Sequence, residues 1–192
     1  MSEKTLLQIR SNLEQYIDIS NEELKSFYKL LESKSYKKGK ILTAFNEVEE
    51  YMYIVIGGIL RLYYKKNSKE YTVEFALNSM IISSFESFIT QQPSSYYLQA
   101  CTDIQVLRIS SAALNSAYKE SKKIEQIGRI IAERKYINRI NKQIDKNSLS
   151  AKEMYFKLKK EMPELFSEIP QHKIATYIGV APESLSRAIN QQ

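Results

Sequence analysis

The sequence predicts an α+β protein in which a β-barrel of the jelly-roll type carries flanking helices and is followed by a long helix and a C-terminal helical unit. Three observations predict this fold. The chain has 192 residues, 43% of them hydrophobic, which is enough to bury a substantial core. Apolar residues recur at helical spacing up to residue 31 and again beyond residue 110. Between them, residues 36–109 form short β-branched and aromatic segments separated by turn residues.

Two helices are expected at the N-terminus, separated by a break at Ser20. Ser20 and Glu23 form a capping-box pattern, in which the hydroxyl and the carboxylate satisfy free amide groups at the start of the second helix. The apolar residues that carry the two helical patterns are Leu6, Ile9, Leu13, Tyr16 and Ile17 in the first, and Leu24, Phe27, Leu30 and Leu31 in the second.

Two short connections in the barrel region are typical of tight turns, Gly57-Gly58 and Asn67-Ser68. Adjacent glycines adopt positive φ without steric cost, so Gly57-Gly58 is the firmer hairpin prediction. The expected strands are Lys40 to Ala44, Tyr51 to Ile56, Ile59 to Tyr64, Glu70 to Leu77, Tyr96 to Ala100 and Gln105 to Ile109.

A long helix is expected after the barrel, because isoleucines recur at helical spacing among charged residues. Either a second copy covers this stripe by coiled-coil packing or the chain's own barrel covers it. Gly128 lies within the helix, where it permits a close approach or weakens the first turns. The residues expected at a dimer seam are Ile130, Ile137, Ile140 and Ile144.

A polar break at residues 145–150 precedes Ser150 and Glu153, which repeat the capping-box pattern before another helix through about Met162. The expected domains are therefore residues 1–118 for the barrel and its N-terminal helices, 119–147 for the long helix and hinge, and 148–192 for the C-terminal helices.

Composition excludes several classes of function. A lone cysteine, Cys101, cannot form an internal disulfide or hold an iron–sulfur cluster, and a lone histidine, His172, cannot supply a histidine-ligated metal site. We therefore expect no metal site. The sequence has neither a secretory signal pattern nor an apolar stretch of membrane-spanning length, so a cytoplasmic location is expected.

The positive charge is confined to one part of the chain. Residues 1–114 carry 13 basic and 13 acidic side chains, whereas residues 115–192 carry 15 basic and 9 acidic ones, which accounts for the whole net charge of +6. Such asymmetry is typical of a protein that binds a polyanion, because basic side chains displace the cations condensed on phosphate. A solvated basic helix explains this one fact equally well.

The segment from Pro170 to Ile189 predicts a helix, a tight turn and a second helix. Pro170 and Pro182 suit the starts of the two helices, and Gly179 suits a left-handed position in the turn. The apolar residues expected to pack between the helices are Ile174, Ala175, Ile178, Val180, Leu185 and Ile189.

Polar residues share the outer face of the second helix. Glu183, Ser184 and Arg187 lie at helical spacing, and a helix fits the major groove of DNA, where arginine contacts guanine and a carboxylate accepts from cytosine. Ser184 and Ser186 suit phosphate contacts. The alternative is an exposed ion pair between Glu183 and Arg187, one turn apart.

The segments Ile174-Ala175-Thr176-Tyr177-Ile178-Gly179-Val180 and Pro182-Glu183-Ser184-Leu185-Ser186-Arg187 resemble the helix-turn-helix of the cyclic-AMP receptor and fumarate–nitrate regulator (Crp/Fnr) family of transcription regulators. The segment from Tyr53 to Tyr63 resembles the hairpin of their sensor domains. The resemblance covers nearly the whole chain and is closest to short family members of Bacteroidetes type. It implies a cyclic-nucleotide-binding-like barrel, a homodimer, double-stranded DNA as partner, contact with RNA polymerase, and no enzymatic activity.

The resemblance also assigns residues to DNA. It places base contacts on Glu183 and Arg187, while Pro182 stands where the best-known members have another arginine, so the sequence preference is expected to differ. Residues up to Gln192 leave little room for a β-wing, so the expected phosphate anchors are Gln171, His172 and Lys173.

The resemblance further implies an effector pocket, at which this chain departs from the family. Ser84-Phe85-Glu86 resembles the start of the phosphate-binding cassette but lacks its glycine, and a serine falls in Pro93-Ser94-Ser95 where the arginine that pairs with the phosphate belongs. Burying a phosphate without a cation is costly. We expect cyclic-AMP binding to be weak or absent, and we assign no cofactor. Glu86, Ser94 and Ser95 are the residues expected to form a pocket for another small-molecule effector.

Two other functions remain open. The first is a small-molecule-binding barrel protein that still responds to a cyclic nucleotide or another effector, or a metal-dependent enzyme built on the barrel, although the first 114 residues contain no histidine. The second is a protein-interaction module whose basic C-terminal part binds an acidic partner without reading a DNA sequence.

Overall fold

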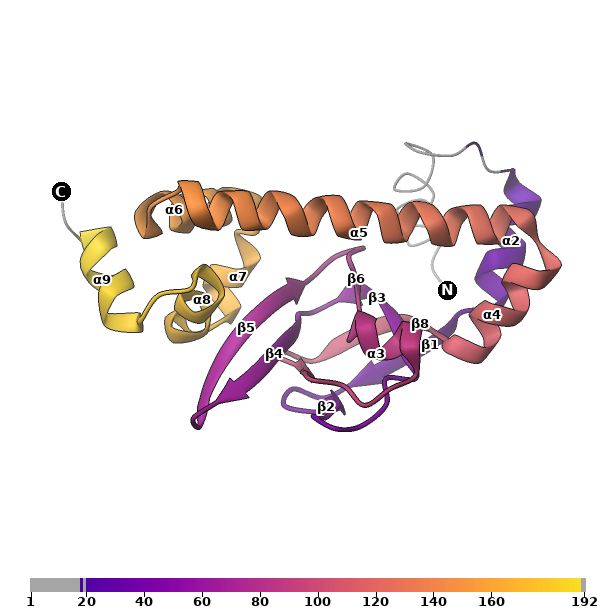
Figure 1. The fold of residues 1–192 in the computed structure, drawn as a ribbon, viewed down its shortest axis with the longest axis horizontal. Helices are drawn as coiled ribbons and strands as arrows, with labels where there is room; N and C mark the ends of the chain where they lie inside the picture. Colours follow the sequence, from indigo (N-terminus) through magenta and orange to yellow (C-terminus); the bar gives the residue numbers. More distant parts are fainter. Residues whose placement is uncertain (1–17, 19, 191–192) are drawn as a thin grey trace.

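The computed structural model describes residue 18 and residues 20–190, which form a two-sheet β-sandwich, a long helix and a group of C-terminal helices (Figure 1). Both sheets have four antiparallel strands. One has the order β1 (Glu32–Tyr36), β8 (Ile104–Ser110), β3 (Tyr51–Gly57) and β6 (Ile81–Ile82). The other has the order β2 (Ile41–Thr43), β7 (Tyr97–Ala100), β4 (Leu60–Lys66) and β5 (Lys69–Ala76).

The longest described helix, α5 (Lys122–Ser148), runs along the sandwich from one end to the other (Figure 1). At one end it meets α4 (Ser111–Glu120) after a break at Ser121, whose extended backbone and hydroxyl cap the start of α5. At the other end lie the C-terminal helices. The remaining helices are α2 (Asn21–Lys29), α3 (Phe85–Thr90), α6 (Ala151–Glu161), α7 (Glu164–Glu168), α8 (Gln171–Ile178) and α9 (Pro182–Asn190).

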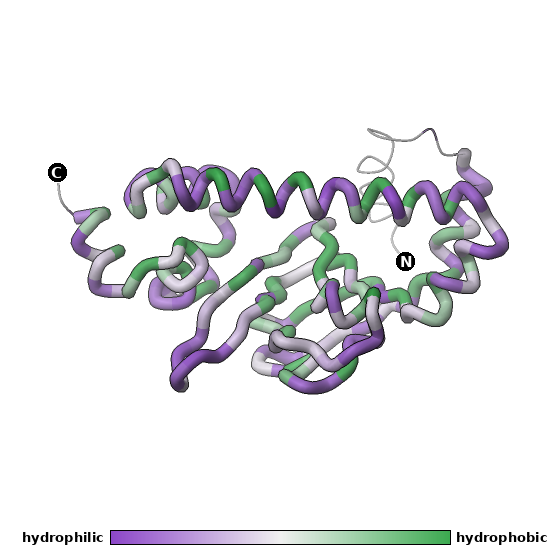
Figure 2. Tube along the Cα trace, in the orientation of Figure 1, coloured by the Kyte–Doolittle hydropathy of each residue, from purple (hydrophilic) through white to green (hydrophobic). Residues whose placement is uncertain are grey.

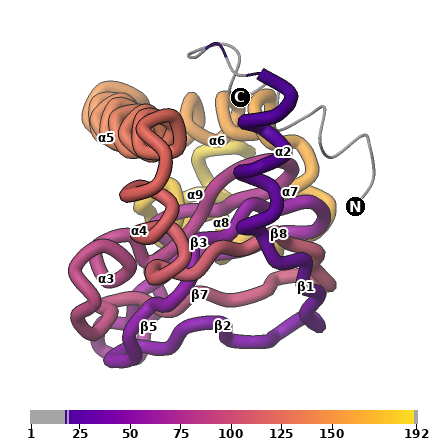
Figure 3. Tube along the Cα trace, turned by 90° about the vertical axis from the view of Figure 1, so that its right-hand side faces the viewer, coloured from indigo at the N-terminus to yellow at the C-terminus, as the bar shows by residue number. Residues whose placement is uncertain are grey.

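The sandwich core lies between the two sheets, where the alternating inward side chains of both sheets meet. Outside it, α2 and α5 cover the sheet that contains β3 and β8 (Figure 3). The fully or nearly fully buried core residues are Tyr53, Val55, Leu60, Leu62, Ala76, Ile82, Leu98, Ala100, Ile104 and Val106.

The hairpin predicted at Gly57-Gly58 is wrong. β3 pairs with β6 and β8, whereas β4 pairs with β5 and β7, so Gly57-Gly58 carries the chain from one sheet to the other. Gly58 has φ 81°, and a Cβ there would overlap the carbonyl of Asp103. Glycine is required because two backbone segments meet where the chain changes sheet. The resemblance of residues 53–63 to a hairpin is therefore also wrong, because the two strands in this segment belong to different sheets.

The connection at Asn67-Ser68 is the one that forms a hairpin. Both residues have positive φ, 50° and 62°, which is the conformation of the two-residue turn that matches strand twist. It joins β4 to β5, which pair from Lys66 and Lys69 back to Leu60 and Ala76.

The isoleucine stripe of α5 is divided between two environments. Ile127 and Ile130 are buried against Leu24 and Tyr28 of α2 and against the sheet, so Ile130 belongs to the chain's own core and its placement at a dimer seam is wrong. Further along, Ile137, Ile140 and Ile144 are 45%, 43% and 56% exposed. Figure 2 shows apolar residues recurring along α5 into this half.

Gly128 allows α4 and α5 to approach closely, because a Cβ there would overlap the hydroxyl of Tyr118 on α4. This confirms the first of the two roles considered for it.

Local signals along the chain predicted most helix starts. Both capping boxes are present, Ser20 with Glu23 and Ser150 with Glu153. All six expected strands form with small changes at their ends, whereas β1, β6, α3 and α7 were not expected. The first expected helix, with Leu6 to Ile17, lies outside the described residues. Within the described part, no helix combines the length and apolar character needed to cross a membrane.

Candidate nucleic-acid interface

The predicted helix, turn and helix are present as α8, a turn at Gly179, and α9. α8 begins after Pro170 and ends at Gly179, which has φ 99° and donates its N–H to the carbonyl of Ala175 at 2.9 Å. Val180 donates to the same carbonyl at 3.0 Å. A Cβ on Gly179 would meet nothing, so the left-handed backbone, and not lack of space, requires glycine there.

The inner face of α9 anchors it to the other C-terminal helices. Leu185 is fully buried, and Ile174, Ala175 and Ile178 of α8 are nearly so, as expected, while Val180 and Ile189 are partly buried. Helices α6 and α7 complete this small core with Met154, Leu158, Leu165 and Ile169.

The outer face of α9 is polar and uncovered. Glu183, Ser184 and Arg187 are exposed, and Ser186 is half-buried. Within the described residues, Glu183 and Arg187 do not form the exposed ion pair that was the alternative interpretation. Their charged groups are therefore available to a partner.

The opposite side of α8 packs on the outer face of β5. Tyr177 contacts Phe75 with ring centroids 5.5 Å apart, and the hydroxyls of Thr72 and Thr176 are 2.7 Å apart. The hydroxyl of Thr72 also lies 3.3 Å from the carbonyl of Lys173. The β-sandwich and the helices α8 and α9 thus share one continuous core within a single chain.

Two of the three expected phosphate anchors lie on the surface and one does not. Gln171 and His172 are exposed at the start of α8. Lys173 is half-buried, and its charge acts on Glu70 of β5, which places it beside the sandwich. The position of Lys173 therefore does not support a phosphate contact.

A buried arginine supports this junction. Arg61 on β4 is fully buried, donates from Nε to Thr72 at 2.8 Å and from Nη1 to Glu70 at 2.6 Å, and lies 4.4 Å from the ring centroid of Tyr63. Burial works to raise the pKa of Glu70, but the hydrogen bond and charge of Arg61 outweigh it and the pKa is lowered. The sequence did not predict the burial of Arg61, because no local pattern shows that another element covers an outward-facing arginine of a strand.

The effector cassette is closed by its own side chains. Ser84, the residue before α3, and Ser94 are buried, and their hydroxyl oxygens are 2.6 Å apart. The N–H of Tyr96 donates to the hydroxyl of Ser94 at 3.0 Å, and the backbone N–H of Ser94 donates to the carbonyl of Glu47 at 2.8 Å. The serine in place of the family's arginine is therefore fully engaged within the chain.

Two of the three expected pocket residues lie together, because the hydroxyl of Ser84 contacts Ser94 and also donates to Glu86 at 3.3 Å. Ser94 is buried, whereas Glu86 and Ser95 are exposed. An effector pocket composed of Glu86, Ser94 and Ser95 stays a prediction. A cavity of about 580 Å³ lies elsewhere, between α3, α4 and α5, and none of the three lines it.

A carboxylate occupies the polar interior beside the cassette. Glu49 is fully buried and accepts from the N–H of Tyr51 at 3.2 Å and from the N–H of Ser84 at 3.4 Å. Burial raises the pKa of Glu49, and its hydrogen bonds with Thr43, Tyr51 and Ser84 only partly oppose this. Glu49 belongs to a cluster of three carboxylates with Glu47 and Glu50, and nothing in the sequence shows which of the three is buried.

Metal chemistry has no evident site in the part of the chain that the structure describes. No group of three or more histidine, cysteine, aspartate or glutamate side chains is arranged there to hold an ion. Cys101 is buried, as expected for a small apolar residue.

Comparisons with known proteins agree with this fold. Residues 33–121 match the family model of the cyclic nucleotide-binding domain. Three solved structures are similar over most of both chains. FixK2 from Bradyrhizobium japonicum has a TM-score of 0.69 at 17% identity over 84% of this chain and 83% of its own. The catabolite activator protein of Thermus thermophilus gives 0.58 at 16%, covering 91% and 84%, and the c-di-GMP responsive global regulator CLP of Xanthomonas campestris gives 0.63 at 14%, covering 86% and 88%.

Residues 33–121 thus match the cyclic nucleotide-binding domain, and the chain has the fold of Crp/Fnr regulators over most of its length. The resemblance drawn from the sequence is confirmed at the level of the fold. No curated protein sequence matches the chain.

Proposed function

We propose that this protein is a homodimeric, cytoplasmic transcription regulator of the Crp/Fnr type, without enzymatic activity, that inserts α9 into the major groove of DNA. The observation that carries the proposal is the two-sided character of α9. Its inner side is anchored by the fully buried Leu185, and its outer side presents exposed Glu183, Ser184 and Arg187. A rigidly held helix with an uncovered polar face is what reading base edges requires.

The polar residues of this surface are proposed to contact either base edges or phosphates. Arg187 donates two hydrogen bonds to guanine, and Glu183 accepts from cytosine. Ser184, Ser186, Gln171 and His172 contact phosphates, which fix the register of the helix without reading sequence.

The test compares two arginine variants. Arg187→Ala is expected to reduce the discrimination between the preferred and unrelated duplexes by about 1–3 kcal/mol, because a base contact is lost. Arg129→Ala, on an exposed part of α5, removes the same charge and is expected to leave discrimination unchanged. The measurement is a competition binding assay at fixed salt. Unchanged discrimination in Arg187→Ala contradicts the role given to α9.

The dimer is proposed to form through the second half of α5. Ile137, Ile140 and Ile144 lie on one face and are about half exposed, which is costly for aliphatic side chains in water. A second α5 related by a twofold axis covers them. We expect Ile137→Glu to sediment as a monomer, and a retained dimer would contradict this seam.

The sensor domain is proposed to work without a cyclic nucleotide. Ser94 stands where the family has its phosphate-pairing arginine, and its hydroxyl is committed to Ser84 and Tyr96. Contact with RNA polymerase follows from the same family resemblance.

A further inference from the structure

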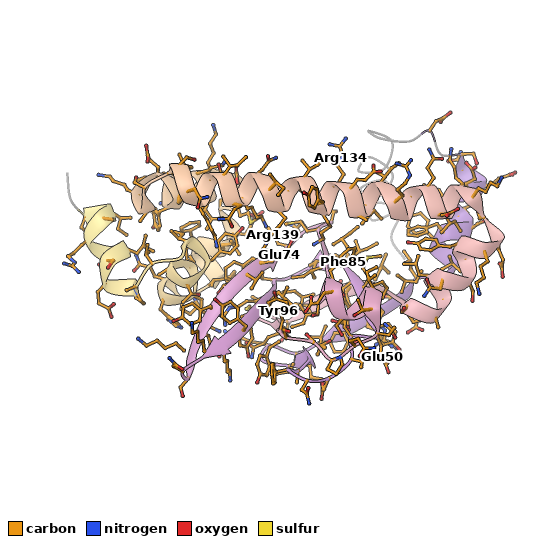
Figure 4. All side chains as sticks on the ribbon, viewed as in Figure 1. Glu50, Glu74, Phe85, Tyr96, Arg134 and Arg139 are labelled. Carbon is orange, nitrogen blue, oxygen red and sulfur yellow. The ribbon has the colours of Figure 1, made fainter. Side chains whose placement is uncertain are left out.

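Four cations lie on one face of α5, outside the DNA-reading surface. Lys135, Arg139, Lys142 and Lys146 are spaced by four, three and four residues, which places them on a single stripe of a helix. The stripe faces β5 and α8. The ammonium group of Lys135 lies 3.0 Å from the carboxylate of Glu74 on β5, and that of Lys142 lies 3.9 Å from it. Figure 4 labels Arg139 and Glu74 in the region between α5 and β5.

The stripe carries more positive than negative charge. Elsewhere in the described chain, Lys37, Arg108 and Lys157 each pair with a carboxylate of their own, while Arg61 and Lys65 share Glu70. Here Lys135 and Lys142 share Glu74, and among the described residues Arg139 and Lys146 form no ion pair, so the four cations and Glu74 together carry a net charge of about +3.

An aromatic side chain of α8 holds two of these cations in place. The ring centroid of Tyr177 is 5.7 Å from the ammonium group of Lys142 and 5.8 Å from that of Lys146. Burial works to lower the pKa of Lys142, but Tyr177 and Glu74 outweigh it and the pKa is raised. Burial, followed by the charges of Arg139 and Lys142, lowers the pKa of Lys146. Lys146 thus lies close enough to Arg139 and Lys142 to be affected by their charges.

We propose that this stripe binds a small anion carrying at least two negative charges on phosphate groups, clasped between α5, β5 and α8. Arg139 provides the planar fork that pairs with phosphate oxygens, and the lysines provide point charges on either side of it. Lys135 and Lys142 are half-buried against β5 and α8, and Arg139 and Lys146 are exposed beside them, so the four cations border a small area of one chain that suits a small anion better than a DNA duplex.

The bound anion is expected to tighten the packing of α8 on β5, because it joins α5 to both elements. The site does not depend on DNA binding, because the excess positive charge lies within one chain. The protein is therefore tested without DNA.

The test measures binding of inorganic pyrophosphate by calorimetry at about 0.15 M salt, where surface attraction is largely screened. One-to-one binding and a rise in Tm are expected for the unaltered chain. The double variant Arg139→Gln/Lys146→Gln is expected to lose at least about tenfold in affinity. Glu74→Gln removes the competing carboxylate and is expected to bind more tightly, while Lys122→Gln, at the far end of α5, is expected to behave as the unaltered chain.

Arg139→Gln/Lys146→Gln and Glu74→Gln are expected to change the affinity in opposite directions. If one of them folds poorly, the other still tests the site. Absence of binding, or weaker binding in Glu74→Gln, overturns the proposal. An equal loss in Lys122→Gln also overturns it, because it shows general attraction to a basic protein. If Arg139 and Lys146 prove necessary for duplex DNA and not for pyrophosphate, the stripe belongs to the DNA interface and the proposed site is wrong.

Discussion

The cassette that contains Ser84 and Ser94 differs from helix α9 in how its polar side chains are paired. In and beside the cassette, Ser84, Ser94 and Glu49 are buried and have hydrogen-bond partners within the chain. On α9, Glu183 and Arg187 are exposed and, within the described residues, form no ion pair with each other. Groups paired inside the fold contribute to stability, whereas groups left unpaired on a rigid surface are available to a partner.

This difference predicts two kinds of mutational effect. Changes in the cassette are expected to alter the free energy of unfolding and leave DNA preference unchanged. Changes on the outer face of α9 are expected to alter DNA preference with little effect on stability.

The largest expected effect comes from the inner face of α9. Leu185→Ala leaves a cavity in the core of the C-terminal helices and is expected to cost about 2–5 kcal/mol of stability. Denaturant unfolding followed by circular dichroism measures it. Ala188, half-buried one residue before Ile189, provides the control Ala188→Ser, which is expected to cost far less. A Leu185 variant as stable as that control would mean that α9 is not anchored as described.

The next effect tests the closed cassette. Ser94→Ala removes the hydroxyl that accepts from the N–H of Tyr96 and pairs with Ser84, so about 1–3 kcal/mol of stability is expected to be lost. Ser95→Ala, its exposed neighbour, is expected to change stability by less than about 0.5 kcal/mol. Equal behaviour of the two variants in thermal unfolding would show that Ser94 is not committed to the fold.

A smaller effect of opposite sign is expected at Glu49. Burial raises its pKa in the folded chain, so the folded state favours the protonated form and loses that stability as the pH rises through the folded pKa. Glu49→Gln is therefore expected to raise Tm by a few degrees at pH 7, with a gain that disappears below the ordinary carboxyl pKa of 4.5. The matched control is exposed Glu50→Gln. A gain that grows as the pH falls would reverse the assignment.

The last prediction concerns cyclic AMP, which is expected to have no effect on Tm. Cyclic AMP at a concentration of about 1 mM is expected to leave Tm unchanged, because a ligand stabilises a fold only if the folded state binds it. A clear rise in Tm would mean that the cassette opens, and the contrast with α9 would then fail.

Features that depend on neighbouring residues along the chain were predictable from the sequence. The capping boxes at Ser20 and Ser150 and the left-handed turn at Gly179 depend on side chains and φ values within a few residues. The isoleucine stripe of α5 was visible for the same reason, since helical spacing is a local pattern.

Features that depend on distant pairing were not predictable. Gly57-Gly58 and Asn67-Ser68 both permit positive φ, and only the order of strands in the two sheets decides which of them closes a hairpin. In the same way, the spacing of Lys135 to Lys146 is visible in the sequence, but the lone Glu74 opposite them comes from a strand some 60 residues earlier. The contact of Thr176 with Thr72 is even further from any local signal, because the two residues are 104 positions apart in the sequence.

Selection of bound duplexes from random DNA tests the central claim most directly. The expected result is a twofold symmetric site whose half-sites are about 10 base pairs apart, or a multiple of that spacing, with specific bases that are lost when Arg187→Ala is selected in parallel. Enrichment of no sequence, or of the same sequence by Arg187→Ala, would contradict a role for α9 in reading DNA.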